Sequence, residues 1–149
     1  MFDLVGLDSL EKWKSTDLNI WDYISDKMSP EDILISSKLY FPKFIRNHNF
    51  YIVEINYDQN HFEESVKNWS QKQNLTKTEF EISWNDTKLY DLFSGSTVEI
   101  ADDILIQLGK ILEFSWMCAL KMQFPDGKFA TQFRHSDEEY GPIITAWSL

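Results

Sequence analysis

The side chains best able to do chemistry in this sequence are its carboxylates, its three histidines and its single cysteine. Acid–base catalysis requires two carboxylates in a cleft with pKa values pushed apart, and adjacency in the sequence does not provide that. Asp102 and Asp103 have a simpler interpretation, because acids in the first turn of a helix interact favourably with its dipole. A small enzyme with a carboxylate site is therefore kept as an alternative and is not the first hypothesis.

The histidines and the cysteine form no complete catalytic or metal-binding pattern. His61 and Glu64 have a spacing used in carboxylate-bridged metal sites, but the second copy of the motif that such a site needs is missing. Cys118 lies in an apolar stretch, which favours a buried structural thiol over a reactive one. The sequence holds no GxSxG, GxGxxG or Walker-type loop. We therefore predict no catalytic residue, no cofactor and no metal site.

The charge balance points toward a protein partner. Twenty-four acidic residues against fourteen basic ones give a formal net charge of −10. Nucleic-acid binding needs a basic patch that neutralises phosphates, and none is present, so that class is set aside. Complementary potentials would instead steer an acidic chain to a basic protein.

Two segments combine acids with aromatic residues, the mixture found at interface hot spots and rims. We interpret them as candidate partner-binding residues: Glu79, Glu81, Trp84, Asp86, Asp137, Glu138, Glu139 and Tyr140. In the alternative interpretation, these acids are only the solvated face of a half-buried strand and a charged surface loop.

The longest predicted element is a helix over about Thr97–Gln123. Ser96 and Glu99 form a capping-box pattern at its start, and Pro125 must end it. About 26 residues at 1.5 Å each span roughly 39 Å, so this helix should cross the molecule. The stretch Phe114–Leu120 lacks a polar stripe, which indicates a helix enclosed on all sides. Phe114, the first residue of this stretch, lies in line with the polar side of the helix. It is either covered by a neighbouring segment or reaches a partner.

Shorter helices are predicted before it. Ser29 followed by Pro30 and two acids is a strong helix start, and Pro42 should stop that helix after about Tyr40. Three of its apolar residues are expected to be buried: Ile33, Leu34 and Leu39. Weaker patterns predict a broken helix over 8–24 and an exposed helix over 61–73 that turns Phe62, Val66 and Trp69 inward.

Strands are predicted where apolar and polar residues alternate or where β-branched and aromatic residues gather. In 78–84 three apolar side chains would face the core, while Glu79 and Glu81 would face solvent. A hairpin is predicted around Asn47-His48-Asn49, and further strands over 88–93, 129–134 and 143–149. Because no regular strand–helix–strand alternation is present, we expect one α+β domain over residues 1–149, with a mostly antiparallel sheet packed around the long helix.

The sequence carries no targeting or membrane signal that we can identify. Its first residues lack a basic segment followed by a long apolar run, and no stretch of 18 apolar residues occurs. One cysteine provides no disulfide framework. We therefore expect a cytoplasmic protein that does not contact membranes.

In general character (small, acidic, single-domain and without a catalytic signature) the chain resembles the immunity proteins of bacterial polymorphic and contact-dependent toxin systems. Those proteins bind the catalytic domain of a toxin, frequently a basic nuclease, and block its site. The resemblance implies an inhibitor whose acidic face covers the toxin's substrate-binding surface, with Trp84 or Tyr140 as a buried anchor, and it transfers no residue roles. A structural or adaptor subunit is a further alternative, which an exposed apolar patch would mark.

Overall fold

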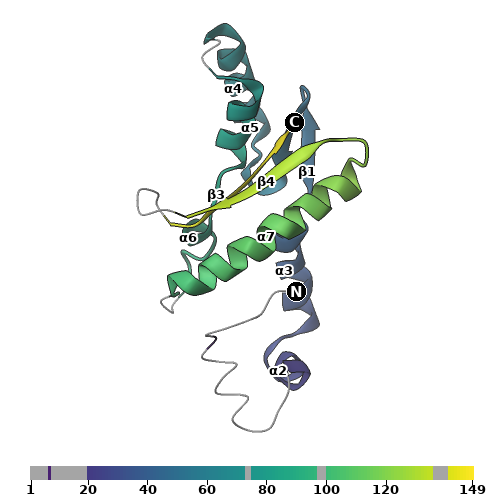
Figure 1. The fold of residues 1–149 in the computed structure, drawn as a ribbon, viewed down its shortest axis with the longest axis vertical. Coiled ribbons are helices and arrows are strands. Elements are labelled where there is room, and N and C mark those ends of the chain that lie inside the picture. Colours follow the sequence, from purple (N-terminus) through teal and green to yellow (C-terminus); the bar gives the residue numbers. More distant parts are fainter. Residues whose placement is uncertain (1–6, 8–19, 73–74, 97–99, 136–140) are drawn as a thin grey trace.

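Helix α7 (Asp102–Gln123) runs diagonally across the molecule, alongside strand β4 (Figure 1). The computed structural model describes residues 7, 20–72, 75–96, 100–135 and 141–149. The predicted end at Gln123 is confirmed, but the helix begins at Asp102, with Ala101 at its N-cap. The Ser96 amide donates to the Phe93 carbonyl, so Ser96 closes an earlier turn and does not cap α7. Thr97 and Glu99 lie outside the described residues.

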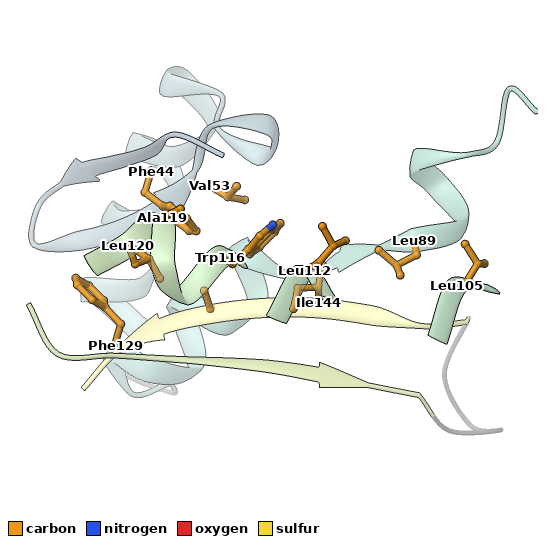
Figure 2. Close-up of a cluster of buried hydrophobic side chains, with 11 residues drawn as sticks. Phe44, Val53, Leu89, Leu105, Leu112, Trp116, Ala119, Leu120, Phe129 and Ile144 are labelled. Carbon is orange, nitrogen blue, oxygen red and sulfur yellow. The ribbon is translucent and has the colours of Figure 1, made fainter. Parts of the chain in front are cut away.

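One side of α7 forms the main core. Leu105, Leu112, Trp116 and Leu120 are buried against the sheet and the first hairpin, as Figure 2 shows. The Phe114 side chain is 63% exposed, so the predicted enclosure is wrong at this residue, whereas 115–120 are all buried or half-buried, as predicted. Outside that stretch, α7 has one buried side and one open side. Within the described ranges, no helix is both long and apolar enough to span a membrane.

Among the described residues, two helices precede the first strand: α2 (Ile20–Lys27) and α3 (Pro30–Tyr40). The predicted start of α3 is confirmed, because Ser29 and Asp32 form a complete capping box. The predicted burial of Leu34 is wrong, since this side chain is 70% exposed, and Ile33 is exposed as well. The reason is that α3 meets α7 near its C-terminal end, where the Trp116 indole N–H donates to the Leu39 carbonyl at 3.0 Å. Most of the weak helix predicted over 8–24 lies outside the described residues.

The predicted hairpin is confirmed as β1 (Phe44–Asn47) and β2 (Phe50–Val53), paired antiparallel. His48 and Asn49 both have positive φ, at 47° and 68°. Two successive residues with positive φ are the requirement of a type I′ turn, and asparagine tolerates that conformation well. The 3-10 turn η1 (Glu54–Asn56) follows β2.

The next two helices are α4 (Gln59–Lys72) and α5 (Lys77–Asn85). The inward face of α4 is as predicted, with Phe62 buried. The strand predicted over 78–84 is wrong. Thr76 and Glu79 form a complete capping box that starts a helix there, with the Thr76 amide donating to the Glu79 carboxylate at 2.7 Å.

The second sheet has three antiparallel strands in the order β3 (Thr87–Lys88), β5 (Ile143–Ser148) and β4 (Phe129–Arg134). The two C-terminal strands were predicted, whereas 88–93 supplies only the start of β3 and then helix α6 (Leu89–Leu92). Gly109 lets α7 approach β4 closely, because a Cβ at this position would overlap the ring of Phe133. The fold is the expected α+β domain, with antiparallel strands and one long helix.

A second, smaller core lies between β2, α4 and α5. It is built on Phe50, Ile52, Phe62 and Phe80, with rings packed mainly edge to face. This aromatic cluster anchors the α4–α5 pair, which projects from the body of the molecule at the top of Figure 1.

Candidate functional site

The structure describes four of the eight predicted partner-binding residues, and these four do not share one exposed face. Asp137, Glu138, Glu139 and Tyr140 lie outside the described residues. The other four lie on α5 or directly after it, and each carboxylate has a different environment. They are therefore considered one at a time.

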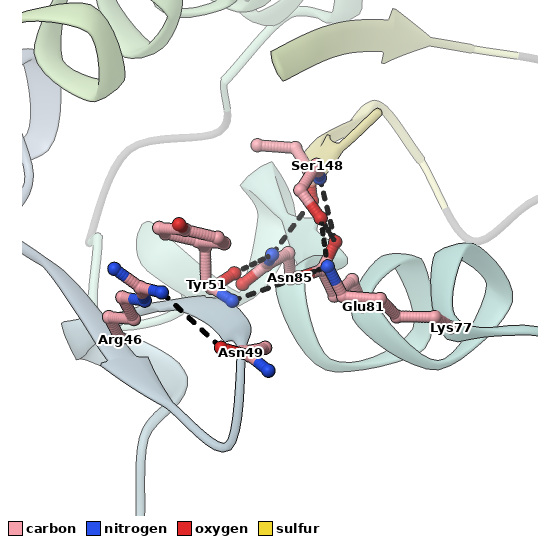
Figure 3. A network of polar contacts seen from close by, with 8 residues as sticks. Arg46, Asn49, Tyr51, Lys77, Glu81, Asn85 and Ser148 are labelled. Carbon is pink, nitrogen blue, oxygen red and sulfur yellow. Dashed lines mark hydrogen bonds and ion pairs between the residues drawn. The ribbon is translucent and has the colours of Figure 1, made fainter. Parts of the chain in front are cut away.

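Glu81 is a buried structural residue and not a surface acid, since its exposed fraction is 0%. Its carboxylate accepts hydrogen bonds from the Tyr51 amide at 2.9 Å and from the Ser148 amide at 2.6 Å (Figure 3). The Ser148 hydroxyl donates a third, at 2.8 Å. The ammonium group of Lys77, one turn earlier, lies 3.8 Å away and is itself partly exposed. Glu81 therefore cannot contact a partner in this conformation.

Asn85, one turn after Glu81, completes the same network. Its side-chain oxygen accepts from the Val53 amide at 2.8 Å, and its NH₂ group donates to the carbonyls of Tyr51 and Ala146 at 2.8 and 2.7 Å. Together the two side chains satisfy five backbone groups of β2 and β5. This α5 clasp, Glu81 and Asn85, joins the hairpin to the three-stranded sheet.

Asp86 is engaged within the fold as well. Arg134 of β4 holds its carboxylate with both guanidinium NH₂ groups, one of them at 3.0 Å, and the second contact is shorter. Both side chains are about a quarter exposed, at 27%. Bidentate pairs of this kind are geometrically specific, so Asp86 ties the end of α5 to β4.

Glu79 is the acid of the original group that the structure places on the surface. It is exposed, and it accepts from the amide and the hydroxyl of Thr76 in the capping box. Those two hydrogen bonds lower the pKa of Glu79 from its ordinary value, and the bond from the Thr76 amide has the larger effect. Its negative charge is therefore retained at any pH near neutrality.

Trp84 lines a groove between the two helices that we call the α4–α5 groove. The groove has a volume of about 310 Å³ and is lined by Ser65, Asn68, Trp69, Leu75, Phe80, Ser83 and Trp84. The Trp84 ring packs edge to face on Phe62, with centroids 5.1 Å apart, and His61 lies 5.2 Å away. The Trp69 indole N–H donates to the Leu75 carbonyl at 2.8 Å, which fixes the other end of the groove.

Two exposed carboxylates flank the α4–α5 groove. Glu64 lies one helical turn before Asn68 on α4, and Glu79 lies one turn before Ser83 on α5. None of the side chains that line the groove is basic. The association of acids with exposed aromatic surface is thus retained in this region, but the acids are Glu64 and Glu79.

Sequence reasoning missed the contribution of Trp69 and Glu64 to this surface. The signal was present, because Thr76-Lys77-Thr78-Glu79 matches the S/T-x-x-E capping box. A helix at that point, after a short connection from α4, predicts an antiparallel pair that brings Trp69 and Trp84 to one seam.

A second concave surface lies between α3, η1, α6 and α7, and we call it the α3 groove. Its volume is about 840 Å³, and the buried Trp116 contributes to its floor. Its apolar lining includes side chains that are exposed, among them Ile35, Phe41 and Ile55. Charged side chains of both signs line it as well: Asp32, Lys38, Lys43 and Glu54.

The two grooves differ in the chemistry of their linings, since the α4–α5 groove has serine, asparagine and aromatic side chains and the α3 groove has charged ones as well. Among the described residues, no three side chains of the metal-binding types (His, Cys, Asp, Glu) converge. Cys118 on α7 is partly buried, and its neighbours on the helix are apolar. The arrangement is suited to binding through shape, aromatic surface and charge. Comparison of the chain with protein-family models, with curated proteins and with solved structures finds no match.

Proposed function

We propose that this protein is a protein-binding inhibitor of the immunity type, which neutralises a basic toxin domain by contact with the α4–α5 groove. The observation that carries the proposal is the placement of Trp69 and Trp84 in a concave seam flanked by Glu64 and Glu79. This seam lies on a helix pair that projects from the body of the fold (Figure 1). A projecting aromatic surface with acids around it is suited to entering the substrate cleft of a basic enzyme.

Physical chemistry supports a division of roles within this surface. Tryptophans bury large apolar area and are enriched among residues that dominate binding energy. Exposed carboxylates at a rim contribute mainly to the rate of association and to its salt dependence. The net charge of −10 adds a long-range attraction toward a basic partner. We place this activity in the cytoplasm, where an immunity protein meets an incoming toxin.

The test begins with the neighbouring reading frame. If a large secreted protein with a distinct C-terminal domain is encoded immediately upstream, that domain is produced with and without this chain, and growth and complex formation are measured. Rescue of growth together with a stable complex is expected. A toxic domain that this chain neither binds nor neutralises would contradict the proposal.

Charge reversal then locates the surface. Glu64→Lys should slow association and reduce its salt dependence, because Glu64 flanks the groove. Glu31→Lys is the matched control, since it makes the same change of charge at an exposed position on α3, away from α4 and α5 (Figure 1). Equal effects of the two substitutions would show that only net charge matters and that the groove is not the contact.

A second candidate function, a structural subunit, is favoured by the α3 groove. The occupant we consider is a second copy of this chain, because two acids and two lysines line the groove in local balance: Asp32, Glu54, Lys38 and Lys43. Two copies related by a twofold axis would bring these groups together without net repulsion, despite the charge of each chain. Light scattering should then show a dimer that Ile35→Glu dissociates, because Ile35 is an exposed apolar side chain of the groove lining. A monomer at all concentrations would exclude this candidate.

A further inference from the structure

Building on the proposed function, we infer that the α4–α5 groove receives one arginine side chain of the partner, held against the tryptophan rings and between Glu64 and Glu79. The inference concerns a single side chain because of the size of the groove. Its volume of about 310 Å³ lies at the lower end of the range for ligand cavities, roughly 300–1,000 Å³. A whole helix would not be enclosed there, whereas one long side chain would fit.

The lining of the groove selects a flat cationic group. Trp69 and Trp84 present aromatic surface, and tryptophan is the side chain that attracts a cation over its ring most strongly. A guanidinium is planar and weakly hydrated, so it stacks on such surfaces at a lower desolvation cost than an ammonium group. The aromatic lining is supported from behind by Phe62 and Phe80, which hold the rings in place.

The polar atoms of the groove fit the same group. Within the described part of the chain, the side chains of Ser65 and Asn68 have no hydrogen-bond partner. Ser83 donates its hydroxyl proton to the Phe80 carbonyl at 2.8 Å, which leaves its oxygen free to accept. A guanidinium carries five N–H donors and no acceptor, so these oxygens are suitable partners. An apolar side chain in the same place would remove them from water without compensation.

The charges around the groove complete the selection. Glu64 on α4 and Glu79 on α5 each lie one helical turn before a residue that lines the groove, and none of the lining side chains is basic. The two hydrogen bonds that Glu79 accepts from Thr76 leave its carboxylate ionised and fixed in position. A cation that enters the groove is therefore attracted from both sides.

The experiment uses the full chain labelled with ¹⁵N at tryptophan, so that each of its six indole N–H groups gives one NMR signal. Trp69→Phe and Trp84→Phe identify the two signals of the groove, and the dispersion of the remaining signals shows whether each variant is folded. The probes are N-acetyl-arginine amide and N-acetyl-citrulline amide, which have nearly the same shape but differ in charge. N-acetyl-leucine amide serves as the apolar probe.

Saturable shifts of the Trp69 and Trp84 signals are expected with the arginine probe, at millimolar concentration. The citrulline probe should bind about fivefold more weakly than the arginine probe. This ratio corresponds to roughly 1 kcal/mol, the contribution of a cation over an exposed aromatic ring. Glu64→Gln should weaken binding of the arginine probe, whereas Glu31→Gln, the same change at an exposed position on α3, should not. Equal binding of citrulline or leucine, or equal shifts at all indoles, would overturn the inference.

The two proposals fail independently. If the arginine probe binds the groove but the chain protects no cell from a toxic domain, the proposed function fails and the arginine site stands. If the chain neutralises a toxin while the probe leaves Trp69 and Trp84 unaffected, the inhibitor role stands and the arginine site is wrong.

Discussion

Replacing Glu81 with glutamine tests whether the α5 clasp holds the two sheets together. The substitution preserves shape but converts one carboxylate oxygen into an NH₂ donor. In the native structure both oxygens are occupied, one by the Tyr51 amide and the other by the amide and hydroxyl of Ser148. A glutamine can satisfy only one of these two sets, so at least one buried N–H faces another donor.

The expected loss of stability follows from that count. A buried donor left without an acceptor costs about 1–3 kcal/mol, and a hydrogen bond to a neutral acceptor is about 1 kcal/mol weaker than one to a charged acceptor. The sum is a loss of about 2–4 kcal/mol. Removal of the buried charge lowers the cost of desolvation and works in the opposite direction, which places the expected value in the lower half of that range. Folded domains are stable by about 5–15 kcal/mol, so the variant should remain folded but unfold at clearly lower urea concentration.

The measurement is urea unfolding followed by tryptophan fluorescence, with the free energy taken from the midpoint and the slope. Glu79→Gln is the matched control, because it makes the same chemical change two residues earlier on the same helix, at an exposed position. Glutamine also serves in the capping box, so this control should lose only the charge-dependent part of the exposed cap, which is smaller than the loss expected at the buried Glu81. If the two variants unfold at the same urea concentration, the buried clasp does not carry the stability that its geometry assigns to it.

Two other predictions follow from single side chains. Gly109→Ala should destabilise the protein by about 1–3 kcal/mol despite alanine's higher helix propensity, because the new Cβ overlaps the Phe133 ring. Its control is Gly95→Ala, which has open space around it and should be close to neutral in the same urea unfolding assay. Acid sensitivity should depend on Glu79, whose pKa is held below its ordinary value of 4.5 by the Thr76 amide and hydroxyl. The unfolded chain then binds more protons, so this contribution to stability is complete above the unfolded pKa and is lost as the pH falls through the lower folded pKa. Glu79→Gln should therefore flatten the decrease in Tm between roughly pH 5 and pH 3, and an unchanged slope would contradict the assignment.

Local signals in the sequence predicted the elements that depend on neighbouring residues. The hairpin follows from Asn47-His48-Asn49 between two β-rich runs, because a turn with two positive φ values closes it. The start of α3 follows from Ser29 and Pro30, and the capping box is complete in the structure. These features need only a few adjacent residues, so a single sequence contains them.

The error at 78–84 has a physical reason. Alternation over seven residues is also compatible with a helix that turns two pairs of side chains inward, with the members of each pair four residues apart. In α5 these pairs are Phe80 with Trp84 and Glu81 with Asn85. The capping box at Thr76 decides in favour of the helix, because it satisfies two backbone donors that a strand would leave to a neighbour. Weighing the cap above the alternation would have predicted α5.

The burial of Glu81 was beyond the reach of sequence reasoning. Its partners Tyr51 and Ser148 are 30 and 67 residues away, so only the tertiary fold shows that a carboxylate is needed between them. The same applies to Asp86, whose partner Arg134 comes from a distant strand. An acid with a buried structural task and an acid at a binding surface have the same appearance in a sequence, and for this reason the predicted acidic face was incomplete.

The α5 clasp also bears on the behaviour of this protein at high concentration. Strand edges with unpaired backbone groups recruit further strands and promote aggregation. Two such edges exist in this fold: the outer edge of β2 at Tyr51 and Val53, and the end of β5 that β3 does not reach. The two side chains of the α5 clasp occupy both of them. Opening of α5 would therefore expose two complementary edges at once. Variants that weaken the clasp are expected to form intermolecular β-structure before they unfold completely.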